Sequence, residues 1–210
     1  MSTGPKWKVK IGAVKEDGDR CDQLAGNPND PRRSGPGVPY QVLKVQAQDA
    51  IEACTAAVAA NPSEPRFKYQ LGRALEFLDR KKAFDIQSRL VKVKYPAAYD
   101  NLGWMYFYDK KNASQAVAHF RMGAELSDPD SMVSLVDMID RGAFNPPNSI
   151  YVKLSLLKRA AELGDEAAVR AYNTEVEKQR ELQARQLNEQ EIQRRMLDAF
   201  GAIMRGIARR

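Results

Sequence analysis

The sequence is poor in the residue types on which most catalytic sites depend. Its 210 residues include a single histidine, His119, and only two cysteines. A structural metal site needs about four suitable ligands, and a cysteine nucleophile needs a neighbouring base, so the sequence predicts neither. The GxSxG, HExxH, P-loop and dinucleotide-binding motifs are also missing. We therefore expect a protein that is not an enzyme and has no catalytic residues, metal or cofactor.

Long apolar runs and strand-like patterns are missing as well. No stretch reaches the roughly 18 apolar residues that a membrane-spanning helix needs, and the first residues lack the apolar core of a signal peptide. Sustained alternation of apolar and polar residues is scarce, which disfavours strands. Hydrophobic residues make up 43% of the chain, a globular value. We expect a folded, almost wholly helical protein without a transmembrane segment or signal peptide.

The sequence does contain a repeat. The nine residues that begin at Phe120 (FRMGAELSD) are echoed about 37 residues later by those that begin at Leu157 (LKRAAELGD). A period of this length is typical of stacked helical hairpins. Glycine inside a helix is unfavourable by roughly 1 kcal/mol relative to alanine. We interpret Gly72 and Gly103, each preceded by leucine within a predicted helix, as points where another helix comes close.

Apolar periodicity and turn residues set the expected helix boundaries. Asp128-Pro129 is typical of a helix start, and Gly164 of a helix end, with Asp165 opening the next helix. The predicted helices are at residues 45–60, 65–78, 81–93, 97–108, 112–126, 129–140 and 150–163.

From Asp165 onward there is no proline, and no glycine before Gly201. We expect one long helix that caps the repeats with its first part and projects beyond them with the rest. The fold class is therefore all-α, an α-solenoid of antiparallel hairpins with an irregular N-terminal arm and a long C-terminal helix. The expected divisions are an arm at 1–40, a solenoid at 41–172 and an extended helix with a basic amphipathic tail at 173–210.

The N-terminal arm combines a basic leader with a loop rich in proline, glycine and asparagine. For residues 1–20 we predict a mobile leader, with a short extended segment around 7–11 as the alternative. Residues 21–40 cannot form a core of their own and should be an ordered loop only if anchored. A disulfide between Cys21 and Cys54 would anchor it and add about 3–4 kcal/mol of stability. The alternative is two reduced thiols in a cytosolic protein.

These motifs resemble a known repeat. Residues 98–106 (AYDNLGWMY), 116–120 and 158–164 (KRAAELG) are similar to the Sel-one-like repeat, a relative of the tetratricopeptide repeat, and 66–94 resembles an ordinary tetratricopeptide hairpin. The resemblance covers about residues 46–172 and implies an α-solenoid that binds other proteins. Two features depart from the pattern, because residues 109–112 (DKKN) replace a glycine-rich turn and Val136 stands where glycine is usual.

A further resemblance concerns the residues before the repeats. The segments CDQLA (21–25), NPND (27–30), GVP (37–39) and AIEAC (50–54) look like a leader that precedes Sel-one-like repeats in bacterial, often exported, proteins. That resemblance favours the Cys21–Cys54 disulfide, since disulfides persist in oxidising compartments. It implies a periplasmic or secreted protein, whereas reduced thiols would imply a cytoplasmic one.

The charge is basic and uneven. The net charge is +6 and the isoelectric point is near 9.3, and residues 66–94 hold nine basic residues against three acidic ones. Basic patches favour acidic partners, anionic lipid or nucleic acid, although solvated helix faces also explain them. Aromatic residues are not interleaved with the basic ones, which disfavours nucleic-acid binding.

Two function classes follow, both without chemistry. The first is an interaction scaffold or adaptor that grips a partner protein or peptide with its concave face and its tail. The second is a structural or accessory subunit of a larger assembly, for example in the cell envelope or at a membrane, held by its N-terminal arm and C-terminal helix. A weaker third is a binder of anionic polymers or membrane surfaces. The tail could instead pack on its own domain, and the aromatic residues could be core. The predicted partner-binding residues are Lys68, Arg73, Tyr99, Tyr106 and Arg121 on the solenoid, and Phe200, Ile203, Met204 and Ile207 on the tail.

Overall fold

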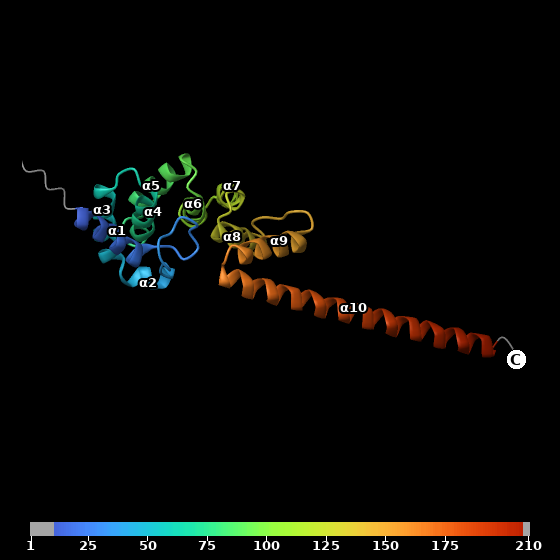
Figure 1. Cartoon of the computed structure of the whole chain (residues 1–210). Helices are drawn as coiled ribbons and strands as arrows, with labels where there is room; N and C mark the ends of the chain where they lie inside the picture. The colour runs from blue at the N-terminus through green and yellow to red at the C-terminus, as the bar shows by residue number, and fades with distance from the viewer. Residues whose placement is uncertain (1–10, 208–210) are drawn as a thin grey trace, which may run out of the picture.

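The protein is a row of helices followed by one long projecting helix (Figure 1). The structure is a computed structural model that describes the backbone of residues 11–207 and the side chains of residues 18–205. Within that range it has ten helices and no strand, so the predicted all-α class is confirmed. The helices are α1 (Ile11–Ala25), α2 (Tyr40–Val45), α3 (Ala47–Ala60), α4 (Pro65–Leu75), α5 (Arg80–Lys92), α6 (Pro96–Tyr108), α7 (Ala113–Glu125), α8 (Pro129–Asp140), α9 (Ser149–Glu162) and α10 (Glu166–Ile207).

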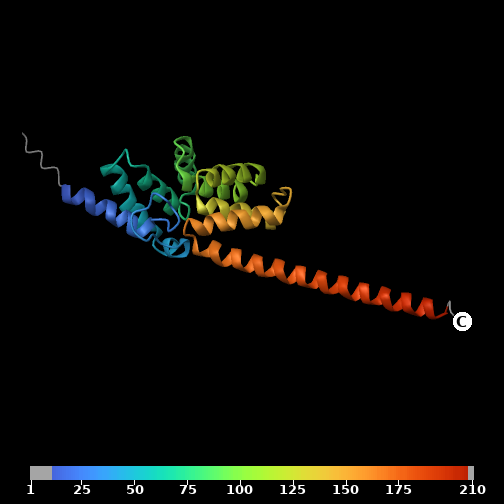
Figure 2. The same ribbon diagram turned by 45° about the vertical axis from the view of Figure 1, so that its right-hand side comes forward.

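The helices stack in chain order as antiparallel pairs. From α3 onward each helix packs on the next one along the chain, and α6 also contacts both α4 and α8. The first helices of successive hairpins therefore form one continuous layer, with α5, α7 and α9 on the other side (Figures 1 and 2). This linear array is the predicted α-solenoid.

Two glycines set the spacing between paired helices, as predicted. A Cβ atom at Gly72 would lie 2.8 Å from Nε2 of Gln87 on α5, and one at Gly103 would overlap the ring of Phe120 on α7. The absence of a side chain lets α4 approach α5 and lets α6 approach α7. The buried Phe120 ring then fills the centre of the second hairpin.

The predicted helix ends are also in place. Asp128 caps α8 by accepting a hydrogen bond from the backbone N–H of Ser131, at 2.9 Å. Gly164 takes a positive φ of +95° after α9, a conformation that glycine adopts without strain. Asp165 then accepts from the N–H groups of Ala167 and Ala168 at the start of α10.

The start of the chain differs from the prediction. The mobile leader predicted for 1–20 is wrong for residues 11–20, because α1 begins at Ile11 and packs against α3 and α4. Its buried residues Cys21 and Ala25 lie four positions apart on one face, too few to reveal a helix among polar neighbours. The alternative extended segment at 7–11 lies almost wholly outside the described residues.

The disulfide expected from the resemblance is present. Cys21 of α1 and Cys54 of α3 are bonded, with their Cα atoms 4.7 Å apart, and both are fully buried. Their neighbours in this core include Leu43, Ala57 and Phe67. The bridge therefore joins two packed helices, and it anchors the loop at residues 26–39 only through α1.

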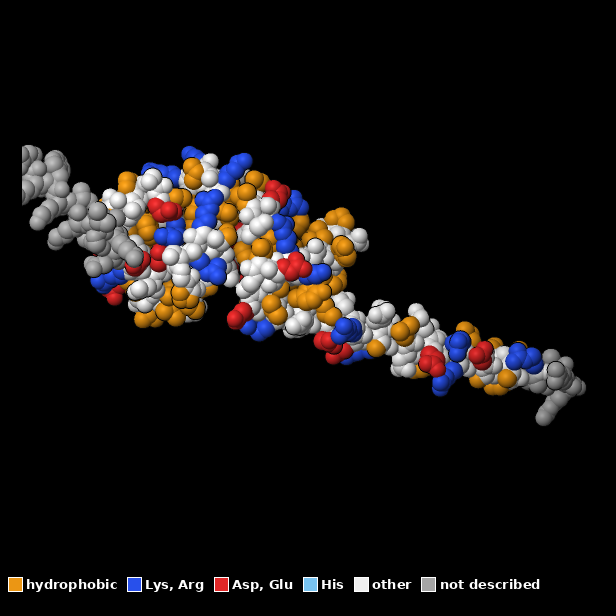
Figure 3. Space-filling model, in the orientation of Figure 1, with side chains coloured by type: hydrophobic (Ala, Val, Ile, Leu, Met, Phe, Trp, Pro, Cys, Tyr) orange, Lys and Arg blue, Asp and Glu red, His pale blue; other side chains and the backbone are white. Residues whose placement is uncertain are grey.

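The last helix leaves the solenoid, as predicted. The beginning of α10 packs on α9, where Ala168 and Glu175 are buried, but every residue from 180 to 200 is exposed. From here on, the arm means the projecting part of α10, residues 180–205, and not the N-terminal residues 1–40. Figure 3 shows its apolar side chains interspersed with charged ones along a free rod. The alternative in which the tail packs on its own domain is therefore not what the described residues show, and none of the helices searched is long and apolar enough to cross a bilayer.

Candidate functional site

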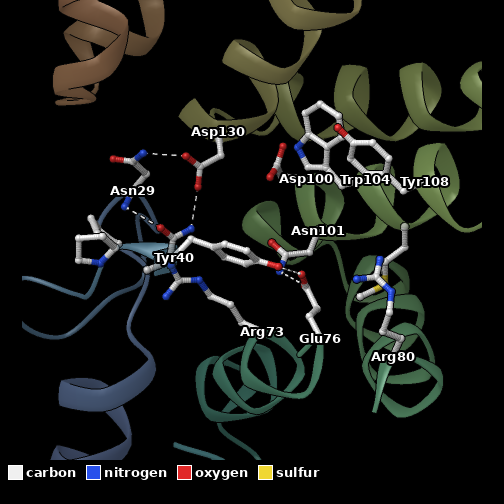
Figure 4. A pocket seen from close by; sticks show the side chains of 14 residues that line it. Asn29, Tyr40, Arg73, Glu76, Arg80, Asp100, Asn101, Trp104, Tyr108 and Asp130 are labelled. Atoms are coloured by element: carbon white, nitrogen blue, oxygen red, sulfur yellow. Dashed lines mark hydrogen bonds between the residues drawn. The ribbon is translucent and has the colours of Figure 1, made fainter. Parts of the chain in front are cut away.

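A polar cleft lies where the N-terminal loop crosses the layer of first helices (Figure 4). Its volume is about 440 Å³, and its walls come from the loop, α2, the end of α4, the start of α5, α6 and α8. We call it the inner cleft. Its lining residues are Asn27, Pro28, Asn29, Pro39, Tyr40, Arg73, Glu76, Arg80, Asp100, Asn101, Trp104, Met105, Tyr108 and Asp130.

Arg73 of α4 holds the loop in place. One terminal nitrogen of its guanidinium donates to the carbonyls of Ala25 and Gly26, at 3.2 and 3.0 Å, and the other donates to that of Val38, at 3.0 Å. The side chain is 5% exposed. Five fixed donors in one plane suit an arginine to bind several carbonyls at once. The loop is therefore wrapped around Arg73 and forms a fixed wall.

Two asparagines of the loop reach helices distant in the sequence. Asn27 Nδ2 donates to Asp130 Oδ2 at 2.7 Å, and Asn29 Nδ2 donates to Asp130 Oδ1 at 2.7 Å and to Asp165 at 3.2 Å. Asn27 also donates to the hydroxyl of Tyr69 at 2.9 Å. The loop thereby joins the first hairpin to α8 and to the start of α10.

The second wall is built around a buried carboxyl group. Glu76 of α4 is 8% exposed and accepts hydrogen bonds from the hydroxyl of Tyr40, at 3.0 Å, and from the amide of Asn101. Burial is the largest influence and raises the pKa of Glu76 to about 7, against the lowering effect of these hydrogen bonds and of Arg73.

The third wall places a carboxylate beside an aromatic pair, as Figure 4 shows. Asp100 Oδ1 accepts from the hydroxyl of Ser134 at 2.5 Å, and that hydroxyl accepts from the indole N–H of Trp104 at 2.9 Å. The rings of Trp104 and Tyr108 stack with centroids 5.4 Å apart, and Tyr108 is 47% exposed. Burial, followed by the charges of Asp130 and Asp128, raises the pKa of Asp100 well above its usual value.

A fourth acidic group lies close behind the cleft. Asp128 is fully buried, and both its bonds from Ser131 reach one oxygen, Oδ2, while Oδ1 has no hydrogen-bond donor. Burial and the charge of Asp130 raise its pKa to about 7. Among the described side chains, no three histidine, cysteine or acidic residues are placed to hold a metal ion. The cleft therefore offers hydrogen bonds, negative charge and aromatic surface.

Of the five predicted contact residues on the solenoid, only Arg73 lines the inner cleft. Lys68 borders a separate apolar hollow between α3, α4 and α5, and its ammonium group donates to the carbonyl of Pro62. Tyr99 is 6% exposed, and its hydroxyl donates to the carbonyl of Val91 at 2.9 Å. The structure thus does not bring Lys68 and Tyr99 to the cleft.

The other two predicted residues, Tyr106 and Arg121, lie away from the cleft, toward or on the second helix α7. Tyr106 stacks on His119 of α7 with ring centroids 5.0 Å apart. Arg121, also on α7, is exposed and covers the ring of Phe144 at 4.5 Å. Burial lowers the pKa of His119, and its contacts are those of a packed aromatic residue.

The predicted tail residues are accessible. Phe200 is 62% exposed, Ile203 60% and Met204 49%, whereas the side chain of Ile207 lies outside the described residues. The basic segment 66–94 divides in two. Arg66, Arg80 and Lys82 pair with acidic residues of the protein itself. The exposed basic residues on α5 and the turn after it that form no ion pair among the described side chains are Lys81, Arg89, Lys92 and Lys94.

Sequence reasoning missed most of the cleft. Asn27 and Asn29 were visible only as part of a leader-like motif, and Asp128 and Asp130 as helix-start residues. Tyr108 belongs to an aromatic cluster at 99–108 that the sequence favoured as core, and Asp100 gave no signal, because their importance depends on which face of α6 meets the loop. Helical periodicity within α6 is blurred, since both of its sides are covered by other helices.

Stacked antiparallel helix pairs with a cleft over the first helices define an α-solenoid of the tetratricopeptide type. The sequence matches no protein-family model, and a search of curated proteins gives no match. Among solved structures the fold is similar to the crystal structure of a Sel1 repeat protein from Oxalobacter formigenes, with a TM-score of 0.51, 18% sequence identity and coverage of 78% of each chain. The predicted likeness to Sel-one-like repeat proteins is confirmed at the level of the fold.

Proposed function

We propose that this protein is a non-catalytic scaffold that holds a segment of a partner protein in the inner cleft. Solenoids of stacked helical hairpins generally present extended binding surfaces to other macromolecules. The observation that carries the proposal is the inner cleft itself, which is about 440 Å³ in volume and lined by Asn29, Asp100, Asn101 and Tyr108. That volume is within the range of ligand sites and suits part of an extended peptide.

The fixed walls support the same proposal. Arg73 and the loop asparagines hold the entrance through hydrogen bonds that are already formed without a partner. A preorganised site loses little conformational entropy when a ligand binds. The energy of new contacts is therefore available for affinity.

Site-specific photo-crosslinking tests the proposal. A photoreactive phenylalanine analogue replaces Tyr108 in the cleft, and in a matched control it replaces Tyr151 of α9, which is 76% exposed and lies outside the cleft. We expect position 108 to crosslink to a defined segment of one partner in cells that make the protein. Crosslinks that are equally frequent from both positions, or none from 108, would contradict the proposal.

The arm favours a second candidate, an accessory subunit held in a larger assembly by α10. Its large apolar side chains have no partner among the described residues, namely Leu182, Leu187, Ile192, Met196, Leu197, Phe200, Ile203 and Met204. Deletion of 192–210 should abolish assembly under this candidate, whereas Tyr108→Ala should abolish it under the first. The two variants, compared in one co-purification experiment, separate the candidates.

We also propose that the protein works in an oxidising compartment, the periplasm or outside the cell. The support is the buried bond between Cys21 and Cys54, since such bonds persist where thiols are not kept reduced. Alkylation of the protein isolated from its native cells, without reductant, should leave both cysteines unlabelled. Two labelled cysteines would place the protein in a reducing compartment.

A further inference from the structure

We infer that the partner segment in the inner cleft presents a basic side chain, arginine or lysine, to Asp100 and the stacked rings of Trp104 and Tyr108. This inference rests on the proposed function and names the chemistry of the partner. The basic composition of the chain suggests an acidic partner. The inference predicts a basic partner side chain instead, because the residues that line the cleft at this point are acidic and aromatic.

Among the described side chains, the acidic groups at the cleft form no ion pair with a basic residue, although the charges of Arg73 and Arg80 act on Glu76. Glu76, Asp100 and Asp130 receive hydrogen bonds only from neutral hydroxyl and amide groups, and Asp128 only from Ser131. None of the four forms an ion pair among the described side chains, whereas carboxylates elsewhere, such as Asp22 and Asp109, do. A buried carboxyl group without a paired cation is kept partly neutral, and a cation supplied by a partner would favour its ionised form.

The two arginines of the cleft wall are already engaged. Arg73 donates to three backbone carbonyls, and Arg80 binds Asp109 through two nitrogens, at 2.8 and 2.9 Å. Neither contacts Asp100. The second oxygen of Asp100, Oδ2, receives no hydrogen bond in the structure, and nor does the fully buried Oδ1 of Asp128 nearby. Of these two oxygens, which have no donor among the described residues, only that of Asp100 belongs to a residue that lines the cleft.

The aromatic pair adds a surface that suits a cation. Trp104 and Tyr108 lie nearly parallel, at 16°, and arginine or lysine is attracted to such faces within about 6 Å. The described side chains form cation–π contacts at five other rings, for example Arg121 over Phe144, but none of these contacts uses Trp104 or Tyr108. A carboxylate next to a free aromatic face selects a basic side chain over an apolar one.

Peptide selection from a random library tests the inference. The full chain is immobilised, and hexapeptides of random sequence are selected on it, with Asp100→Asn and the exposed control Asp85→Asn on α5 selected in parallel. We expect arginine or lysine to be enriched at one position on the wild type and on Asp85→Asn, and not on Asp100→Asn. The net charge of the chain is +6, so non-specific attraction would enrich acidic peptides instead.

The possible outcomes separate the two proposals. Binders that crosslink to position 108 but lack a basic residue overturn the inference and leave the proposed function standing. A library that yields no binder at the cleft counts against the proposed function itself. Equal enrichment of basic residues on Asp100→Asn and Asp85→Asn also overturns the inference.

A selected peptide then allows a quantitative check. Replacing its basic residue with citrulline or norleucine should weaken binding to the wild type at least tenfold and should have little further effect on Asp100→Asn. Tyr108→Ala, which changes an exposed ring and leaves the carboxylates intact, should weaken the basic peptide several-fold. Thermal melting confirms that each variant is folded. If replacing the basic residue of the peptide weakens binding to Asp100→Asn as much as binding to the wild type, the basic residue binds elsewhere and the inference is wrong.

Discussion

The solenoid body and the arm use similar residues in opposite ways. In the body, large apolar side chains such as Phe120 and Met132 are fully buried, and even charged groups such as Arg73 and Glu76 are covered and hydrogen-bonded. In the arm, every residue from 180 to 200 is exposed, Phe200 included. The difference teaches that burial in the body specifies the fold, whereas the apolar residues of the arm add nothing to the fold of a single chain.

The largest expected effect lies in the body, at its disulfide. Removing the Cys21–Cys54 bond, which spans 33 residues, should lower the free energy of unfolding by about 3–4 kcal/mol, because the unfolded chain gains conformational freedom. Guanidinium denaturation of the wild type, with and without reductant, and of the double variant Cys21→Ala/Cys54→Ala measures the loss. Deletion of 192–210 should change the denaturation midpoint very little. A loss of stability as large as that of the disulfide variant would contradict the difference drawn between body and arm.

Arg73 should give the next largest effect. Arg73→Met keeps much of the apolar volume but removes three hydrogen bonds to backbone carbonyls, of which only that of Gly26 keeps another donor, the N–H of Val38, so we expect a loss of about 3 kcal/mol. Arg89→Met, at an exposed position of α5, is the matched control and should change stability by less than about 0.5 kcal/mol. Hydrogen exchange of residues 26–39 locates the change, which should appear as faster exchange of the loop only in the first variant.

Glu76 should make the body sensitive to pH. Its pKa is raised from 4.5 to about 7 in the folded protein, so the folded state binds a proton more tightly than the unfolded chain does. Stability from this group is therefore lost as the pH rises from about 4.5 to about 7. Glu76→Gln, which cannot ionise, should recover about 3 kcal/mol at pH 8 relative to pH 4, at about 1.4 kcal/mol per pKa unit.

Melting temperatures measured at both pH values test this prediction. Glu162→Gln, at a largely exposed position of α9, is the control and should track the wild type. Asp100 and Asp128 have raised pKa values as well, so part of the pH dependence should persist in Glu76→Gln. A wild type that becomes more stable between pH 4.5 and 7 would contradict the assignment.

The smallest effect should be in the arm. Leu187→Ala, at a side chain that is 59% exposed, should change the free energy of unfolding by less than about 0.5 kcal/mol. Leu157→Ala, at a side chain that is 2% exposed on α9, should cost about 3 kcal/mol. Denaturant titrations of the two variants at low protein concentration compare the regions directly, and similar losses would mean that the arm is buried in solution.

Most of the fold was predictable because helical hairpins are specified locally. The echo of residues 120–128 at 157–165, the glycines at 72 and 103 and the caps at 128 and 164 each depend on residues close in the chain. One exception is α2 (Tyr40–Val45), which is a separate short helix where one helix at 45–60 was predicted. The larger exception is α1, whose helix is stabilised mainly by α3 and α4. Its apolar pattern is too short to stand out before those helices are placed.

The candidate site was far less predictable, and the reason is distance along the chain. Asn27 meets Asp130 across 103 residues, and Tyr40 meets Glu76 across 36. Arg73 was chosen as a binding residue from its charge, yet its role in the structure is to hold the loop. Helix propensity and periodicity carry no information about which loop settles on which helix face.

The reach of the N-terminal loop has a consequence for how the chain acquires its structure. Asn29 bonds to Asp130 and Asp165, 101 and 136 residues further on, whereas units of a simple solenoid contact only their neighbours. As the polypeptide is synthesised, residues 26–39 therefore lack some of their hydrogen-bond partners until the start of α10 has been made. A segment that is made before α8 and α10 thus reaches its final set of hydrogen bonds only after both have begun to form.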